Sequence, residues 1–242
     1  MLEDRGFSTV TLASIRVQAE RTRPPRALWT SAAMGRPVGE PDDRDFQMRV
    51  LRMALSLLER TDGPVILEDF PDDPPGLNDT PGWTAPATQA ATFTTPDDWR
   101  AAFTAEMQAL LPLWAEAQIR FGRTSTGLSF RTPDAWPALA ADVLGGGLPG
   151  GLPGGLPVTR QLGTTALTVR FLCDDIKALY GEAAQARGPK PSPMQVDTWF
   201  WRHTVAGEML RALRGLAMAS ENNGLKTVGG RFFVPTPWIV PA

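Results

Sequence analysis

Apolar residues recur every three or four positions along much of the chain, which is the spacing of helices that bury one face. The clearest series lies between Ser192 and Ala219 and consists of Val196, Trp199, His203, Ala206, Leu210, Leu213 and Ala217. It begins after a capping box at 192–195 with proline at the first helical position. The pattern predicts one continuous helix whose core-facing stripe contains the only histidine of the chain, His203.

The same spacing predicts further helices, each with start or stop signals. One follows Asp42 and Asp43, which can cap it, and one begins at the capping sequence Thr95-Pro96-Asp97-Asp98. Proline at position 112 should kink the second of these, because proline lacks the backbone donor. Shorter or less marked helices are expected at 8–21, 132–144 and 164–187. A short strand is expected at 64–67, and extended structure near 231–240.

Segments rich in proline and glycine divide these elements. Residues 71–95 show no sustained period and read as an extended connector on the surface between two units. A Gly-Gly-Leu-Pro unit repeats three times at 146–157 and is interpreted as an insertion. We therefore predict a mainly α protein: a helical bundle with hairpins, one or two short strands and long connectors. Its parts are a helix-plus-strand module at 1–70, the connector at 71–95 and a helical bundle at 96–242.

Composition limits the function classes. The net charge of −2 and the pI near 5.5 provide no basic surface for nucleic acid. No apolar run approaches the roughly 20 residues that span a bilayer, and no signal peptide is recognised at the N-terminus. Cys173 is the only cysteine, so we expect no intrachain disulfide and a cytoplasmic location. No cofactor and no oligomeric state can be named from these features.

A candidate site follows from the hairpin of helices predicted around Pro189. Its geometry places Asp175 across from His203, and Glu182 lies on the same side of its helix two turns later. We expect an Asp175–His203 hydrogen bond. Two interpretations stay open: a buried polar pair that only stabilises the core, or a general base or metal ligand that Asp175 orients. Nothing in the spacing demands a metal, and we predict none.

Aromatic residues surround this pair in the predicted hairpin. Trp199, Trp201 and Tyr180 would wall a ligand pocket beside His203. The alternative is that they fill the core between several elements.

The segment from Thr61 to Trp99 contains eight acidic residues and neither lysine nor arginine. Such a run is typical of a solvated face or linker, and it can also form a docking surface for a basic partner. Together with the aromatic-rich C-terminal half, it favours an accessory protein that binds a partner or a small apolar ligand. The alternative is an enzyme centred on His203 and Asp175, with Glu182 as a further candidate.

One segment resembles a known family. The sequence Gly35-Arg36-Pro37-Val38-Gly39-Glu40-Pro41, then Phe46-Gln47 and the run from Val50 to Leu58, is similar to small bacterial proteins grouped with the selenoprotein B component of glycine, sarcosine and betaine reductases. The resemblance covers about 29–70 and implies reductive chemistry at a selenocysteine or cysteine. No cysteine lies in this segment, so the activity is not carried over. Gly35 and Gly39 would permit tight turns, and Arg36 would bind an acid such as Glu68 or Asp69.

Overall fold

The computed structural model describes residues 2–32, 35–74, 79–88, 93–147 and 163–239. The chain divides into two compact units, Met1–Thr80 with Ser192–Met194, and Pro81–Pro191 with Gln195–Ala242. Each unit has its own hydrophobic core. They are described separately below and called the N-terminal and the C-terminal unit.

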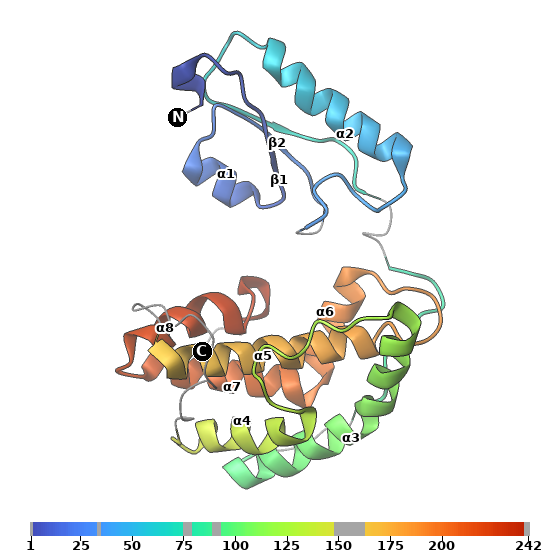
Figure 1. Cartoon of the computed structure of the whole chain (residues 1–242), viewed down its shortest axis with the longest axis vertical. Coiled ribbons are helices and arrows are strands. Elements are labelled where there is room, and N and C mark those ends of the chain that lie inside the picture. Colours follow the sequence, from blue (N-terminus) through green and yellow to red (C-terminus); the bar gives the residue numbers. More distant parts are fainter. Residues whose placement is uncertain (1, 33–34, 75–78, 89–92, 148–162, 240–242) are drawn as a thin grey trace. The chain divides into compact units, whose positions relative to one another are not determined.

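The N-terminal unit contains a three-stranded parallel sheet in the order β1-β2-β3. Its strands are β1 (Thr11–Ala13), β2 (Arg26–Trp29) and β3 (Ile66–Asp69). Helix α1 (Arg16–Thr22) connects the first two strands, and α2 (Arg44–Ser56) belongs to the connection from the second strand to the third (Figure 1). Single helical turns occur at η1 (Glu3–Arg5) and η2 (Leu57–Glu59). Asp43 caps α2 by accepting the backbone N–H of Phe46, as the sequence predicted.

The two helices of this unit pack on opposite faces of the sheet. Residues that are neighbours across a parallel ladder point to the same side, so Leu12, Leu28 and Glu68 share one face. Leu12 and Leu28 pack there with the buried face of α2, which consists of Phe46, Val50 and Ala54. The opposite face carries Ala27 and Asp69. Arg16 of α1 donates hydrogen bonds to the Asp69 carboxylate, which places α1 on that face.

The sequence did not predict two of these strands, β1 and β2. It predicted one helix at 8–21, whereas residues 11–13 are strand and α1 begins only at Arg16. The reason is tertiary: Thr11 and Ala13 pair with Ala27 and Trp29, which supply backbone hydrogen bonds that an isolated segment lacks. The predicted strand at 64–67 exists, displaced to Ile66–Asp69.

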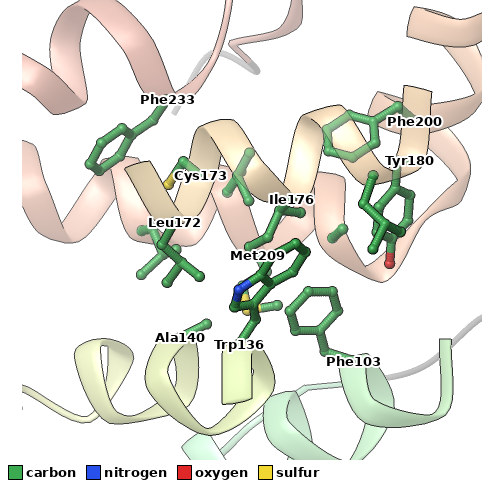
Figure 2. Packing of buried hydrophobic residues seen from close by; sticks show 14 of the residues in the cluster. Phe103, Trp136, Ala140, Leu172, Cys173, Ile176, Tyr180, Phe200, Met209 and Phe233 are labelled. Carbon is green, nitrogen blue, oxygen red and sulfur yellow. The ribbon is translucent and has the colours of Figure 1, made fainter. Parts of the chain in front are cut away.

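The C-terminal unit is helical, so the mainly α prediction is confirmed. Its long helices are α3 (Pro96–Phe121), α4 (Trp136–Leu144), α5 (Gly163–Ala183), α6 (Pro193–His203) and α7 (Val205–Ala219). The shorter elements are η3 (Pro133–Ala135), α8 (Asn223–Val228), the π-helical turn η4 (Gly229–Phe233) and η5 (Thr236–Trp238). Figure 2 shows Phe103 of α3, Trp136 of α4 and Met209 of α7 meeting in one interior, against the buried side of α5.

Helix α3 begins as the sequence predicted. Thr95 accepts the backbone N–H of Asp98, and the Asp98 carboxylate in turn accepts the N–H of Thr95. The helix continues through Pro112, and its ribbon bends part-way along its length (Figure 1). Asp98 also accepts from Thr94, and these hydrogen bonds lower the pKa of its carboxyl to about 2.

The continuous helix predicted at 192–219 is wrong, because the chain breaks at Thr204. Thr204 is extended, with φ −119° and ψ 147°, and its hydroxyl oxygen accepts the N–H of Gly207 to cap α7. Two further N–H groups, those of Val205 and Ala206, donate to the buried carboxylate of Glu106 on α3. A distant residue therefore supplies the acceptors that make a second helix start favourable.

Two other predictions of extended structure need correction. Residues 229–233 and 236–238 form helical turns, because α8 runs directly into η4. Within the predicted connector, Trp83 donates its indole N–H to the carbonyl of Ala184, and Pro86 accepts from the indole of Trp199. This stretch is therefore packed against the helical core. The Gly-Gly-Leu-Pro repeats lie outside the described residues beyond position 147.

Candidate functional site

His203 does not lie in the core. It is exposed at the end of α6, just before the break at Thr204. The predicted inward position depended on an unbroken helix, and the extended Thr204 changes the direction of the following turn. Asp175 and His203, which are both described, do not form the expected hydrogen bond with each other. The geometric basis for that pair was therefore wrong.

Asp175 instead holds a loop. Its fully buried carboxylate accepts the backbone N–H groups of Gly127, Leu128 and Ser129, each at 2.9 Å, and the Ser129 hydroxyl at 2.5 Å. Both oxygens are occupied by these donors. The residue is a structural anchor for the segment 122–132, which is called the anchored loop below.

Glu182 holds the same loop from two turns further along α5. Its carboxylate accepts the N–H of Ser125 at 2.6 Å, the hydroxyl of Thr124 at 2.8 Å and the indole N–H of Trp114 at 2.8 Å. The sequence predicted Asp175 and Glu182 on one side of their helix, which agrees with their shared attachment to this loop. The loop partners of these two acids could not be predicted, because the loop sequence shows no regular spacing of apolar residues.

The three aromatic residues proposed as pocket walls are buried. Tyr180 packs against Trp199 and Phe200, with ring centroids 5.8 and 5.2 Å apart, and Phe200 packs edge-on against Trp201 at 4.7 Å. These contacts fill the core, which was the second of the two interpretations. Figure 2 shows Tyr180 and Phe200 side by side in this cluster.

The Tyr180 hydroxyl donates a 2.6 Å hydrogen bond to Glu106. Burial raises the pKa of the Glu106 carboxyl, although the hydrogen bonds from Tyr180, Val205 and Ala206 oppose this effect. The pKa of Tyr180 lies well above its ordinary value, first because of burial and then because of the adjacent Glu106. This pair was not foreseen, since its members are 74 residues apart.

Arg36 forms an ion pair with Glu40 at 2.6 Å, so its predicted contact with Glu68 or Asp69 was wrong. Glu68 pairs with Arg60, and Asp69 with Arg16. Most other acids of the 61–99 segment also have partners within their own unit: Asp62 with Arg60, Asp72 with Arg49, Asp97 with Arg100, and Asp98 at the cap of α3. Satisfied acids fit the solvated-face interpretation better than a free docking surface.

Over the described ranges, no three His, Cys, Asp or Glu side chains are grouped as metal ligands would be. Cys173 is buried, and burial raises the pKa of its thiol to about 12, so it is not a ready nucleophile.

A groove in the N-terminal unit is large enough for a small ligand or an extended segment. It has a volume of about 430 Å³ and lies between β1 and α1. None of its lining residues is ionisable: Thr11, Leu12, Ala13, Ser14, Ile15, Gln18, Ala19, Thr22 and Pro24. Such a surface suits an uncharged ligand.

The groove runs along an open sheet edge. Among the described residues, β1 pairs with β2 alone, and the carbonyl of Ala13 accepts the N–H of Thr30 on that side. Because backbone groups alternate in direction along a parallel strand, those of Leu12 and Ser14 point away from β2. Neither residue has a backbone partner there among the described parts of the chain. The groove thus presents both an uncharged surface and free backbone groups.

The sequence did not predict this groove, because the pattern at 8–21 favoured a helix. The β-branched run Thr9-Val10-Thr11 was the available signal for a strand. Searches against family models, curated proteins and solved structures found no match for this chain. Within the described residues, no helix combines the length and apolar character needed to cross a membrane.

Proposed function

We propose that this chain is a binding protein whose N-terminal unit takes up an extended, uncharged segment of a partner protein. The segment lies in the groove between β1 and α1 and adds a strand to the open edge of the sheet. The observation that carries the proposal is the combination of free backbone groups at Leu12 and Ser14 with a lining that holds no charge.

The physical argument has two parts. Backbone hydrogen bonds to an exposed edge supply affinity without depending on the partner's sequence, whereas the pockets for alternate side chains supply specificity. A charged side chain placed in this groove would lose hydration with no ion-pair partner to replace it. The partner segment should therefore be rich in small and β-branched apolar residues.

The test uses the full chain and a phage-displayed library of short random peptides. Enriched peptides should be uncharged and rich in Val, Ile, Ala and Thr. Fluorescence anisotropy then measures their affinity for variants. Ser14→Pro removes an outward N–H and should weaken binding at least about tenfold, whereas Ser14→Ala retains that N–H and should bind normally.

Gln18→Glu provides a second variant that does not touch the backbone. It places a negative charge on the groove lining and should also weaken binding, while unfolding curves confirm that each variant folds. Equal affinity of the selected peptides for all three variants would overturn the proposal. So would a library that yields no binder while a neutral dye such as Nile red binds, because that result indicates a small apolar ligand.

The other hypotheses are weaker. Among the described residues, no carboxylate forms a hydrogen bond with the exposed imidazole of His203, and an enzyme centred on this residue would need one to orient the ring. A reductase-related role depends on the resemblance of residues 29–70, which contain no cysteine. Gly35 and Gly39 do adopt positive φ, at 87° and 89°, as turns in that segment require. We also retain the cytoplasm as the proposed location, since a chain with a single cysteine forms no intrachain disulfide.

A further inference from the structure

The C-terminal unit contains a separate cavity beside the anchored loop. It has a volume of about 250 Å³. The end of α3 contributes Phe121, the loop contributes Arg123 and Ser125, and α5 contributes Ala178, Gly181, Glu182 and Gln185. The small residues of α5 leave the space open, and a Cβ added at Gly181 would meet no atom within 4 Å.

The two charged residues of this cavity differ in how many hydrogen-bond partners their side chains have. The Glu182 carboxylate accepts from Ser125, Thr124 and Trp114, so three donors already compensate its charge. The Arg123 guanidinium has no hydrogen-bond or ion-pair partner within the described part of the chain. The unsatisfied charge beside the cavity is therefore positive.

We propose that this cavity binds a small organic carboxylate. Its carboxylate meets the Arg123 guanidinium, whose planar array of donors matches two carboxylate oxygens. The ring of Phe121, which is 43% exposed, forms an apolar wall for the body of the ligand. The Ser125 hydroxyl can add a further hydrogen bond.

The position of the site depends on the two acids that anchor the loop. Asp175 holds residues 127–129 and Glu182 holds residues 124 and 125, so Arg123 is attached immediately before a restrained segment. A guanidinium whose backbone is already restrained loses less conformational freedom when it binds. This inference concerns a different unit from the peptide groove and does not depend on it.

The test uses benzoate as the probe, with benzyl alcohol as a neutral analogue and benzylamine as a cationic one. The indole N–H of Trp114 contacts Glu182 and therefore reports on the cavity in two-dimensional ¹H–¹⁵N spectra. The chain has eight tryptophans, so Trp114→Phe identifies its signal. Benzoate should shift this signal in a saturable manner, and the two analogues should bind at least about tenfold more weakly.

Variants separate the role of the charge from that of the space. Arg123→Gln and Gly181→Leu should each weaken benzoate binding at least about tenfold, the first by removing the cation and the second by filling the cavity. Arg131→Gln removes another exposed arginine of the same loop and should bind like the unmodified chain. Ser14→Pro, in the other unit, should also leave benzoate binding unchanged.

Three results would overturn this inference: unchanged benzoate binding by Arg123→Gln, tighter binding of benzylamine than of benzoate, or no saturable shift with any probe. Because the exposed Arg123 side chain has no hydrogen bond or ion pair to lose among the described residues, its glutamine variant should fold, and thermal unfolding checks this.

Discussion

Tyr180 donates a hydrogen bond of 2.6 Å to Glu106, and the same carboxylate accepts the first backbone N–H groups of α7. This arrangement joins α3, α5 and the start of α7 at one buried acid. It also explains why the chain can break its helix at Thr204 without leaving buried donors unsatisfied.

The buried acid makes a prediction about pH. Because burial raises the pKa of Glu106, the folded chain holds this proton more tightly than the unfolded chain, whose value is near 4.5. The resulting stabilisation is complete below 4.5 and is lost as the pH rises through the raised pKa. In urea denaturation between pH 4 and pH 8, the unmodified chain should therefore lose stability relative to Glu106→Gln as the pH rises.

Tyr180→Phe provides the check on this prediction if Glu106→Gln folds poorly. Loss of the hydroxyl removes a hydrogen bond that favours the charged carboxylate, so the pKa of Glu106 should rise further. The variant should lose about 1.5–3 kcal/mol, and its pH-dependent decline should extend to higher pH. A stability difference between the unmodified chain and Tyr180→Phe that shrinks as the pH rises contradicts the interpretation.

Asp175 and Asp174 form a matched pair for testing the loop anchor. Asp175→Ala leaves three backbone N–H groups and a hydroxyl without their acceptor and should destabilise the chain by about 2–4 kcal/mol. Asp174 makes partly exposed ion pairs with Arg170 and Lys177, so Asp174→Ala should change stability by about 1 kcal/mol or less. Hydrogen exchange should show faster exchange at residues 127–129 only in the first variant.

Gly207 and Gly215 both lie in α7, and substitutions at these two positions test the helix break at Thr204. A Cβ at Gly207 would lie 2.2 Å from the backbone oxygen of Phe200, so Gly207→Ala should destabilise by about 2 kcal/mol or more. A Cβ at Gly215 would meet nothing within 4 Å, and Gly215→Ala should stabilise by up to about 1 kcal/mol. Similar effects of the two substitutions in thermal unfolding would argue for a continuous helix.

Substitutions at His203 and Trp199 compare an exposed position of α6 with a buried one. His203→Ala should change the free energy of unfolding by no more than about 0.5 kcal/mol, because the side chain is exposed. Trp199 is buried and donates to the carbonyl of Pro86, so Trp199→Ala should lose about 3–5 kcal/mol. A large loss in the histidine variant would place the imidazole back in the core.

The sequence predicted best where neighbouring residues decide the structure. The caps at Asp43 and Thr95 act within one turn, and both helices begin where these residues place them. The shared side of Asp175 and Glu182 on α5 follows from helical periodicity alone. The loop partners of these acids could not be predicted in this way, because they lie 46 to 58 residues away in the sequence.

The amino-acid sequence by itself determined the mainly α character, the starts of the capped helices and the stripe of apolar residues on each. These depend on contacts within a few residues, which periodicity and capping chemistry describe. Only the tertiary structure decided the strand at β1 and the break at Thr204. Each depends on backbone hydrogen bonds supplied from elsewhere, by β2 in one case and by Glu106 in the other, and a local pattern contains no record of a distant partner.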